Sequence, residues 1–280
     1  MDYSLSEINI YPIKSVQGVS LDSCQVTSAG LLNDRQYMLV DENNEFVTGR
    51  DKPTLTQVQV NEVSATEWHL SHPSKNDVFI FHTDQLTPDY KKVIIWEDEL
   101  EAQVAAQGVN DWFSNIVEKQ VQLVFFGSQS ERFTQRKPDT PVAFADGYPF
   151  HLTTEASLAE LNDNCTIESS MAQFRPNLVV KGNKPFEEDS WKRIRIGEVE
   201  FENVKPCVRC IFITVDPATG ERYKRGEPLK TLGKFRVLKN KGITFGSNLI
   251  ALNSGVVNQG DQVEVLEYQE PEVYLDRRRR

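Results

Sequence analysis

The stretch "KPCVRCIFITVDPATGERYKRGEP", residues 205–228, holds two of the chain's four cysteines and spaces them as a CxxC pair. Four interpretations are open for Cys207 and Cys210: a redox dithiol, half of a zinc site, ligation of another metal, or buried packing. The β-branched and aromatic run after Cys210 predicts a strand over 211–215. A thioredoxin-type dithiol lies at the N-terminus of a helix, so a strand there disfavours redox-pair chemistry.

Residues elsewhere in the sequence bear on the zinc, packing and metal-ligand interpretations of the two thiols. A structural zinc site needs four ligands, but Cys24 and Cys165 are isolated, and His69 and His72 lie far upstream in a polar stretch that we expect to be an exposed turn. Free cysteines are often buried as small apolar side chains. Arg209, a permanent cation between the thiols, favours a thiolate, which is a soft ligand for a soft transition metal. Packing and metal ligation both stay open at this point.

Composition excludes several classes of protein. The chain has 280 residues, 39% of them hydrophobic, which is typical of a globular protein with one large or two modest domains. Its net charge of −10 argues against binding to nucleic acid. We find no apolar run long enough to cross a membrane and no secretory signal, and the few cysteines suit a reducing compartment. We therefore expect a cytoplasmic protein without membrane or nucleic-acid partners.

Strand patterns dominate the chain. Tyr37–Val40 and Phe46–Thr48 read as a hairpin, and a second hairpin turns around Glu97 to Glu99. Apolar residues at helical spacing predict a helix over Val109–Val117, and Thr154 can cap a second helix. The sequence thus predicts a mostly β fold with a few helices (α+β), with a barrel or sandwich at the N-terminus. Further strands are expected at 121–126, 177–180, 193–196, 199–201, 248–252 and 262–266, and a linker or functional loop at 127–141.

The segment "CVRCIFITVDPATG" resembles the C-terminal motif of MOSC-domain proteins, the molybdenum-cofactor family that includes the mitochondrial amidoxime-reducing component and bacterial YcbX-like proteins. The resemblance covers almost the whole chain. The other matching segments, in order, are "IYPIKSVQG", "DRQYMLVDE", "FVTGRD", "FADGYPFHLTTEASL", "FRPNLVV" and "FGSNLIAL…VNQGDQVEVL".

The resemblance implies an N-terminal β-barrel-like domain over residues 1–120, a β-rich MOSC domain over 121–268 and a tail over 269–280. The tail ends in a basic block, Arg277 to Arg280, that we expect to be solvated. The resemblance also implies a molybdenum cofactor (Mo-molybdopterin) whose metal is bound by the thiolate of Cys210, the catalytic position. Cys207 is then expected to pack behind the site.

The resemblance further implies which residues hold the cofactor. Arginine offers a planar fork for the cofactor's phosphate, and an amide suits the pterin edge, for which Asn177 is the candidate. The backbone of a tight turn at residues 146–148 would approach the cofactor closely. The implied cofactor-binding set is Lys14, Ser15, Arg35, Arg50, Asp146, Gly147, Tyr148, Arg175, Asn177, Arg209 and Asn248.

The family chemistry is the reduction of N-hydroxylated compounds such as amidoximes, hydroxylamines and N-hydroxylated base analogues, a detoxifying reaction. Its electrons would come from a separate iron–sulfur or flavin protein, or from a C-terminal ferredoxin domain that these 280 residues do not include, since no Cx4CxxC spacing occurs. The alternative function is a molybdenum-cofactor carrier or storage protein, or a sulfur carrier, without reductase activity.

Overall fold

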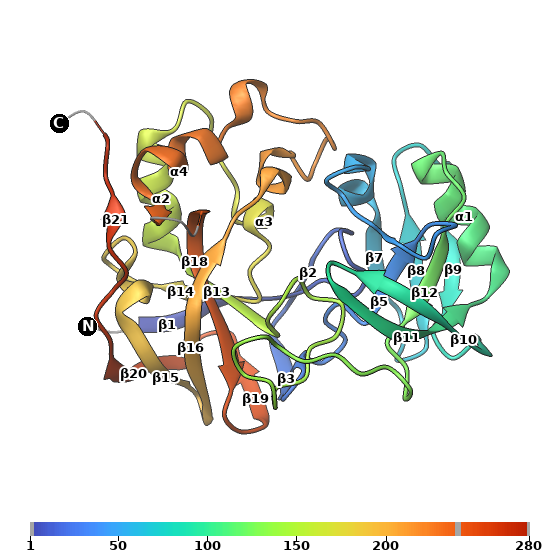
Figure 1. Ribbon diagram of the computed structural model, residues 1–280, viewed down its shortest axis with the longest axis horizontal. Helices are drawn as coiled ribbons and strands as arrows, with labels where there is room; N and C mark the ends of the chain where they lie inside the picture. The colour runs from blue at the N-terminus through green and yellow to red at the C-terminus, as the bar shows by residue number, and fades with distance from the viewer. Residues whose placement is uncertain (1–2, 239–241, 279–280) are drawn as a thin grey trace.

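The computed structural model describes residues 3–238 and 242–278 and divides them between two β-rich halves that lie side by side (Figure 1). Strands predominate and the helices are few and short, which confirms the expected α+β class with a barrel-like N-terminal part and a β-rich MOSC part. No helix within the described ranges is both long and apolar enough to span a bilayer.

The first half is a five-stranded sheet whose two ends are brought together by a bridge between Glu45 and Ile94. The order in this sheet is β10-β11-β12-β5-β6, and β7, β8 and β9 form a separate three-stranded sheet. Helix α1 (Gln107–Val117) and the 3-10 helix η1 (Pro53–Gln57) cover its core. The strand bounds are β5 (Tyr37–Val40), β6 (Phe46–Val47), β7 (Gln59–Glu62), β8 (Glu67–Ser71), β9 (Phe79–His82), β10 (Leu86–Ile95), β11 (Asp98–Ala105) and β12 (Gln122–Phe125).

The second half is a closed ring of strands in the order β13-β14-β1-β20-β15-β16-β18, which closes because β18 also pairs with β13. Strand β2 adds to β1, strands β17 and β21 extend the sheet beyond β18, and β19, β3 and β4 form a small separate sheet. The bounds are β1 (Tyr3–Ile10), β2 (Val19–Leu21), β3 (Ser23–Thr27), β4 (Gly30–Leu31), β13 (Phe150–Thr154), β14 (Leu178–Lys181), β15 (Trp191–Ile196), β16 (Val199–Val208), β17 (Val237–Leu238), β18 (Gly242–Ala251), β19 (Gly255–Asn258), β20 (Gln262–Tyr268) and β21 (Tyr274–Leu275).

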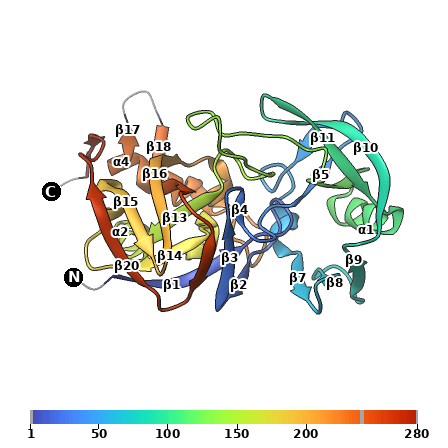
Figure 2. The same ribbon diagram turned by 90° about the horizontal axis from the view of Figure 1, so that it is seen from below.

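Short helices cover one side of this ring (Figure 2). They are α2 (Glu155–Asn164), α3 (Met171–Phe174), α4 (Leu229–Phe235), η2 (Glu187–Ser190), η3 (Ile211–Thr214) and η4 (Lys224–Gly226). Phe174, Ile213, Phe235 and Phe245 form a core cluster between α3, η3, α4 and β18.

The second half of the molecule is built from two separate segments of the chain, one before and one after the first half. Strand β1 lies between β14 and β20, so the chain starts in the second half, builds the first, and returns through residues 127–149 (Figure 1). Strand β12, beyond residue 120, completes the sheet of the first half. Each half therefore takes strands from both of the predicted ranges, 1–120 and 121–268.

Several local predictions are confirmed. Helix α1 buries Val109, Trp112, Phe113, Ile116 and Val117, the apolar face that the helical spacing indicated. The backbone N–H of Ser157 donates to the Thr154 hydroxyl at 3.2 Å, so Thr154 caps α2 as expected. Both predicted hairpins form, β5 with β6 and β10 with β11.

The strand predicted over 211–215 is wrong, because these residues form the 3-10 helix η3 and its C-cap. Directly after β16, the backbone N–H of Arg209 donates a hydrogen bond to the Ile243 carbonyl. Beyond it the chain turns away, and Ile213 is buried in the aromatic cluster of α3, α4 and β18. Tertiary packing thus outweighs the β propensity of this apolar run.

Two further expectations fail. His72 is buried and its ring bonds to Thr54 and Ser74, so it is not in an exposed turn. Arg277 is exposed, as expected, although its backbone N–H donates to the Lys234 carbonyl, whereas Arg278 is half-buried and pairs with Glu160, so Arg278 is not part of a solvated tail. Arg279 and Arg280 lie outside the described residues.

A buried carboxylate in η2 predicts a pH effect on stability. Glu188 is 1% exposed, and burial, reinforced by Asp189, raises its pKa to about 7. In the unfolded chain a glutamate titrates near pH 4.3. Between about pH 4.3 and pH 7, Glu188 is therefore protonated in the folded chain but ionised in the unfolded chain. The free energy of unfolding falls as the pH rises through this range.

We expect the free energy of unfolding of the native chain to fall, relative to Glu188→Gln, by about 2 kcal/mol between pH 5 and pH 8. Urea unfolding at pH 5, 6, 7 and 8 measures this difference. Replacement of Glu131, which is exposed, by glutamine is the control and should leave the pH slope unchanged. An unchanged slope in Glu188→Gln would contradict the role of this carboxylate.

Candidate functional site

A cleft of about 230 Å³ lies where the two halves meet, and all twelve residues singled out in the sequence line it. They come from segments spread over more than two hundred residues, so their convergence is a result of the fold. The twelve are Lys14, Ser15, Arg35, Arg50, Asp146, Gly147, Tyr148, Arg175, Asn177, Arg209, Cys210 and Asn248.

Strand β16 carries the CxxC segment to the cleft. Its pairing with β18 shifts register twice, between Asn203 and Lys205 and between Pro206 and Val208. Pro206 cannot donate a ladder bond, so irregular pairing at this position fits its chemistry. Cys210 follows as the N-cap residue of η3 and is exposed at the cleft.

The two thiols differ in their surroundings, although both are free and both line the cleft. Cys207 is half-buried and accepts a hydrogen bond from Nη1 of Arg209 at 3.0 Å. The expectation that Cys207 packs behind the site is therefore wrong. Arg209 also donates from Nη2 to the Phe174 carbonyl at 2.7 Å, which fixes the guanidinium next to the cleft.

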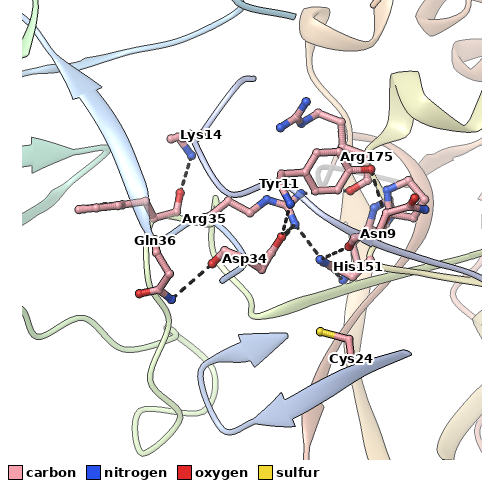
Figure 3. Close-up of polar contacts among 12 residues, drawn as sticks. Asn9, Tyr11, Lys14, Cys24, Asp34, Arg35, Gln36, His151 and Arg175 are labelled. Atoms are coloured by element: carbon pink, nitrogen blue, oxygen red, sulfur yellow. Dashed lines mark hydrogen bonds and ion pairs between the residues drawn. The ribbon is translucent and has the colours of Figure 1, made fainter. Parts of the chain in front are cut away.

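Two arginines stack on one tyrosine ring. The guanidinium carbons of Arg35 and Arg175 both lie 4.1 Å from the ring centroid of Tyr11. Arg35 is held further by the buried carboxylate of Asp34, at 2.7 and 2.8 Å, and donates to the Arg175 carbonyl at 3.1 Å (Figure 3). The 140 residues that separate the two arginines in sequence are thus bridged by direct contact.

Backbone strain is concentrated at this end of the cleft. Ser15, Arg35 and Arg175 have φ values of 71°, 48° and 53°, in the left-handed region that residues other than glycine rarely adopt. Such conformations persist where the surrounding contacts hold them, and they are frequent at functional sites.

The two candidate amides have different environments. Asn177 is 1% exposed, its Oδ1 accepts from Arg35 and from the His151 N–H, and its Nδ2 donates to the Asn9 carbonyl. Its side chain is fully engaged by protein partners. Asn248, on β18, is half-buried and lines the cleft with no protein hydrogen bond to its amide among those of the described residues.

Residues 145–148, in the bend before β13, form another wall of the cleft. Nζ of Lys14 donates to the Phe144 carbonyl at 2.8 Å and pairs with Asp146 at 2.5 Å. Burial lowers the pKa of Lys14, whereas Lys14 holds the pKa of Asp146 below its usual range even though desolvation acts in the opposite direction. An added Cβ on Gly147 would meet no atom within 4 Å, so open space lies directly beside this residue.

The cleft is strongly cationic although the chain is acidic. Six basic residues line it (Lys14, Arg35, Arg50, Arg175, Lys205 and Arg209), against one acidic residue, Asp146. Nη2 of Arg175 and Nε of Arg209 are buried donors without a hydrogen-bond partner among the residues that the structure describes. Burial and the nearby charge of Arg35 lower the pKa of Arg175 to about 10. Two unpaired guanidinium donors among six basic residues make this cleft chemically suited to an anion.

Two known families of domain match successive ranges of this chain. A family model described as "MOSC N-terminal beta barrel domain" matches residues 3–120, and one described as "MOSC domain" matches 139–264. A protein of Danio rerio named mitochondrial amidoxime-reducing component 1 is 31% identical over 94% of this chain and 85% of its own length. The chain belongs to the MOSC family.

Other relatives of this MOSC chain are named either as amidoxime-reducing components or as a molybdenum cofactor sulfurase. The human mitochondrial amidoxime-reducing component 1 is 30% identical over 94% of this chain and 83% of its own length. A rice protein (Oryza sativa subsp. japonica) named molybdenum cofactor sulfurase is 29% identical over 93% of this chain, but the match covers only 34% of that protein.

Sequence reasoning missed part of this MOSC cleft. Tyr11 and Asp34 order the two arginines, and Lys205 lines the cleft from β16, but none was singled out. Tyr11 and Asp34 each lie within three residues of a candidate cation, Lys14 or Arg35, in the quoted motifs. An aromatic ring or a carboxylate within three residues of a candidate cation could have marked Tyr11 and Asp34 as residues that order the site.

Segments of the two halves touch at the mouth of the cleft. A Cβ on Gly49 would lie 2.4 Å from the Phe212 ring, so a larger residue where the Arg50 segment crosses η3 would displace this ring. Arg222 donates to the Arg50 carbonyl, and Gln57 donates to the Ala218 carbonyl at 3.3 Å. These contacts place Arg50 beside the CxxC segment.

Proposed function

We propose that this MOSC protein is a molybdenum-cofactor-dependent reductase of N-hydroxylated compounds such as amidoximes, hydroxylamines and N-hydroxylated base analogues. The observation that carries the proposal is the exposed thiol of Cys210 in a cleft with two buried, unpaired guanidinium donors. The names of the amidoxime-reducing relatives support the same reaction class.

The residues present fit a molybdenum cofactor, whose phosphate requires local cations. Arg175 offers Nη2 and Arg209 offers Nε, both buried and unpaired, and Arg50 adds a third guanidinium. The open space beside Gly147 leaves room for a group to approach the backbone of the bend. When bound, the cofactor would supply the electron-transfer chemistry that reduces an N–O bond.

We assign the remaining roles from the contacts. Cys210 is the metal ligand, because it is the exposed thiol at the cleft and a thiolate is a soft donor. Asn248 offers a free amide to the cofactor or substrate. Asn177 and Asp34 are positioning residues, because their polar atoms hold Arg35 and the backbone around it.

The carboxylate in the cleft acts as an acceptor. Because Lys14 keeps the pKa of Asp146 low, Asp146 stays ionised at neutral pH and cannot serve as a general acid. Protons for the reaction therefore come from solvent or from another group, and Asp146 fixes Lys14 and the bend.

Electrons come from a separate donor, for which an iron–sulfur or flavin protein is proposed. We propose a cytoplasmic location because all four cysteines are free, which suits a reducing compartment. The animal relatives named above are mitochondrial, so fractionation of cells that express the full-length protein is the test.

Protein purified from a host that makes the cofactor should contain about one molybdenum per chain, because the one exposed thiol of the cleft, that of Cys210, faces the same cavity as the unpaired guanidinium donors. Metal analysis and the fluorescence of the oxidised pterin measure this content. Stoichiometric zinc without pterin would overturn the assignment. Reduction of benzamidoxime with a supplied electron donor tests the activity, and bound cofactor without turnover would indicate a carrier or storage role.

A further inference from the structure

A second cavity, of about 880 Å³, adjoins the cleft. The two share one wall, made by Arg50, Asp146, Gly147, Tyr148 and Lys205. The second cavity is therefore positioned as an approach to the cleft from the surface, and a molecule in it would reach the groups around Cys210 directly.

Exposed apolar side chains from three separate segments converge on this second cavity. Trp96 lies in the β10–β11 turn, Phe133 in the loop 127–141, and Ile211 at the start of η3, and they are 43%, 51% and 53% exposed. A single exposed apolar residue is ordinary. Three that line one cavity beside a polar site are typical of a ligand pocket.

The aromatic wall is pre-ordered. Trp96 has a left-handed φ of 58°, its ring centroid lies 5.1 Å from that of Phe46, and the Arg50 guanidinium lies 4.2 Å from its ring. The loop that carries Phe133 is fastened by Arg132, which is 7% exposed and donates from Nε to Asp98 at 2.7 Å. Ordered rings lose little entropy when a flat ligand binds.

Acidic residues outnumber basic ones in the second cavity, where the basic residues are Arg132 and, on the shared wall, Arg50 and Lys205. Glu45, Asp51 and Glu97 line it in addition to Asp98, which Arg132 neutralises. Glu45 and Glu97 are exposed and have no ion-pair partner among the residues that the structure describes. Basic residues thus predominate around the inner cleft and on the wall that it shares with the second cavity, whereas the exposed carboxylates of Glu45 and Glu97 lie beyond that wall in the second cavity.

We propose that the second cavity is the substrate vestibule and that it selects flat aromatic N-hydroxylated substrates that carry a positive charge at the end remote from the N–O group. This selection rests on the proposed reductase function. The neutral N-hydroxy group enters the cationic cleft, the ring packs against Trp96 and Phe133, and the distal cation lies near Glu45 and Glu97. A carboxylate at the same end of the ligand would meet the like charges of Glu45 and Glu97.

Binding of two matched ligands tests the selection without turnover. The cation 4-(aminomethyl)benzamidoxime and the anion 4-carboxybenzamidoxime differ only in the distal group, and calorimetry on the purified holoprotein gives both dissociation constants. We expect the cation to bind about fivefold or more tightly than the anion at low salt. Because Trp68, Trp112 and Trp191 are at most 8% exposed, a ligand-induced change in tryptophan fluorescence reports mainly Trp96.

Variants assign the effect to residues. Trp96→Ala should weaken both ligands about tenfold, and Trp96→Phe should restore most of the affinity, since a ring is retained. The double variant Glu45→Gln, Glu97→Gln should reduce the cation preference to about twofold or less. Tyr268→Ala and Glu42→Gln, an exposed aromatic and an exposed acid that line neither cavity, are controls expected to bind as the native chain does.

Equal affinity for the two ligands, or unaltered binding in Trp96→Ala with a normal unfolding curve, would overturn the vestibule. This failure is distinct from failure of the proposed function. A protein that reduces benzamidoxime but shows no preference refutes only the vestibule, whereas a protein that binds with the expected preference but holds no molybdenum refutes the reductase and leaves only the ligand selectivity of the cavity.

Discussion

Replacement of Cys210 by serine is expected to remove the bound metal and to lower the reduction of benzamidoxime by about a hundredfold or more. A hydroxyl is a harder and less acidic donor than a thiol, so it does not replace a thiolate on a soft metal. Because Cys210 is exposed at the cleft, the substitution should leave the fold intact. Metal analysis, turnover and thermal unfolding of the same preparation measure the three quantities.

Cys207→Ser is the matched control, since it changes a second thiol three residues away in the same cleft. Its loss weakens one contact, the 3.0 Å hydrogen bond from Arg209, so activity should fall by only about tenfold at most while the metal is retained. Equal losses from both substitutions, in folded protein, would mean that the CxxC segment acts as a pair.

Much of the local structure could be predicted because its causes are local. The apolar spacing of Val109 to Val117 predicted α1, and the hydroxyl of Thr154 predicted the start of α2. The run Ile211 to Val215 failed for the opposite reason, because contacts with the distant Phe174 and Phe245 decide its conformation.

The sequence motifs identified which residues belong to the candidate site, but they did not predict the contacts between these residues. The motif that contains Tyr11 could have marked this ring as a site residue, but the sequence could not show that Arg35 and Arg175 both stack on it, because that contact depends on β1 joining the second half of the molecule. The full engagement of the Asn177 amide was hidden for the same reason, since its partners Asn9, Arg35 and His151 lie far away in sequence.

Arg175→Ala is expected to yield folded protein that retains cofactor about tenfold or more weakly than the native chain. The lost Nη2 is a buried donor that no described residue pairs with, and a charge-assisted contact to an anion contributes about 1.5–3 kcal/mol. Arg175→Lys should restore only part of the retention, because the ammonium keeps the charge but loses the fork. Molybdenum content after dialysis measures the effect.

Arg35→Ala should also deplete the cofactor, but with a second consequence that identifies its role. Arg35 neutralises Asp34, whose side chain is 2% exposed, and an uncompensated buried carboxylate destabilises a fold by about 3–5 kcal/mol. The double variant Asp34→Asn, Arg35→Ala should regain most of that stability while its cofactor content stays low, and Arg35→Ala with Arg175→Ala should yield apo-protein. If both single variants keep full molybdenum and activity, the anion of this cleft is held elsewhere and the assignment of the two arginines is wrong.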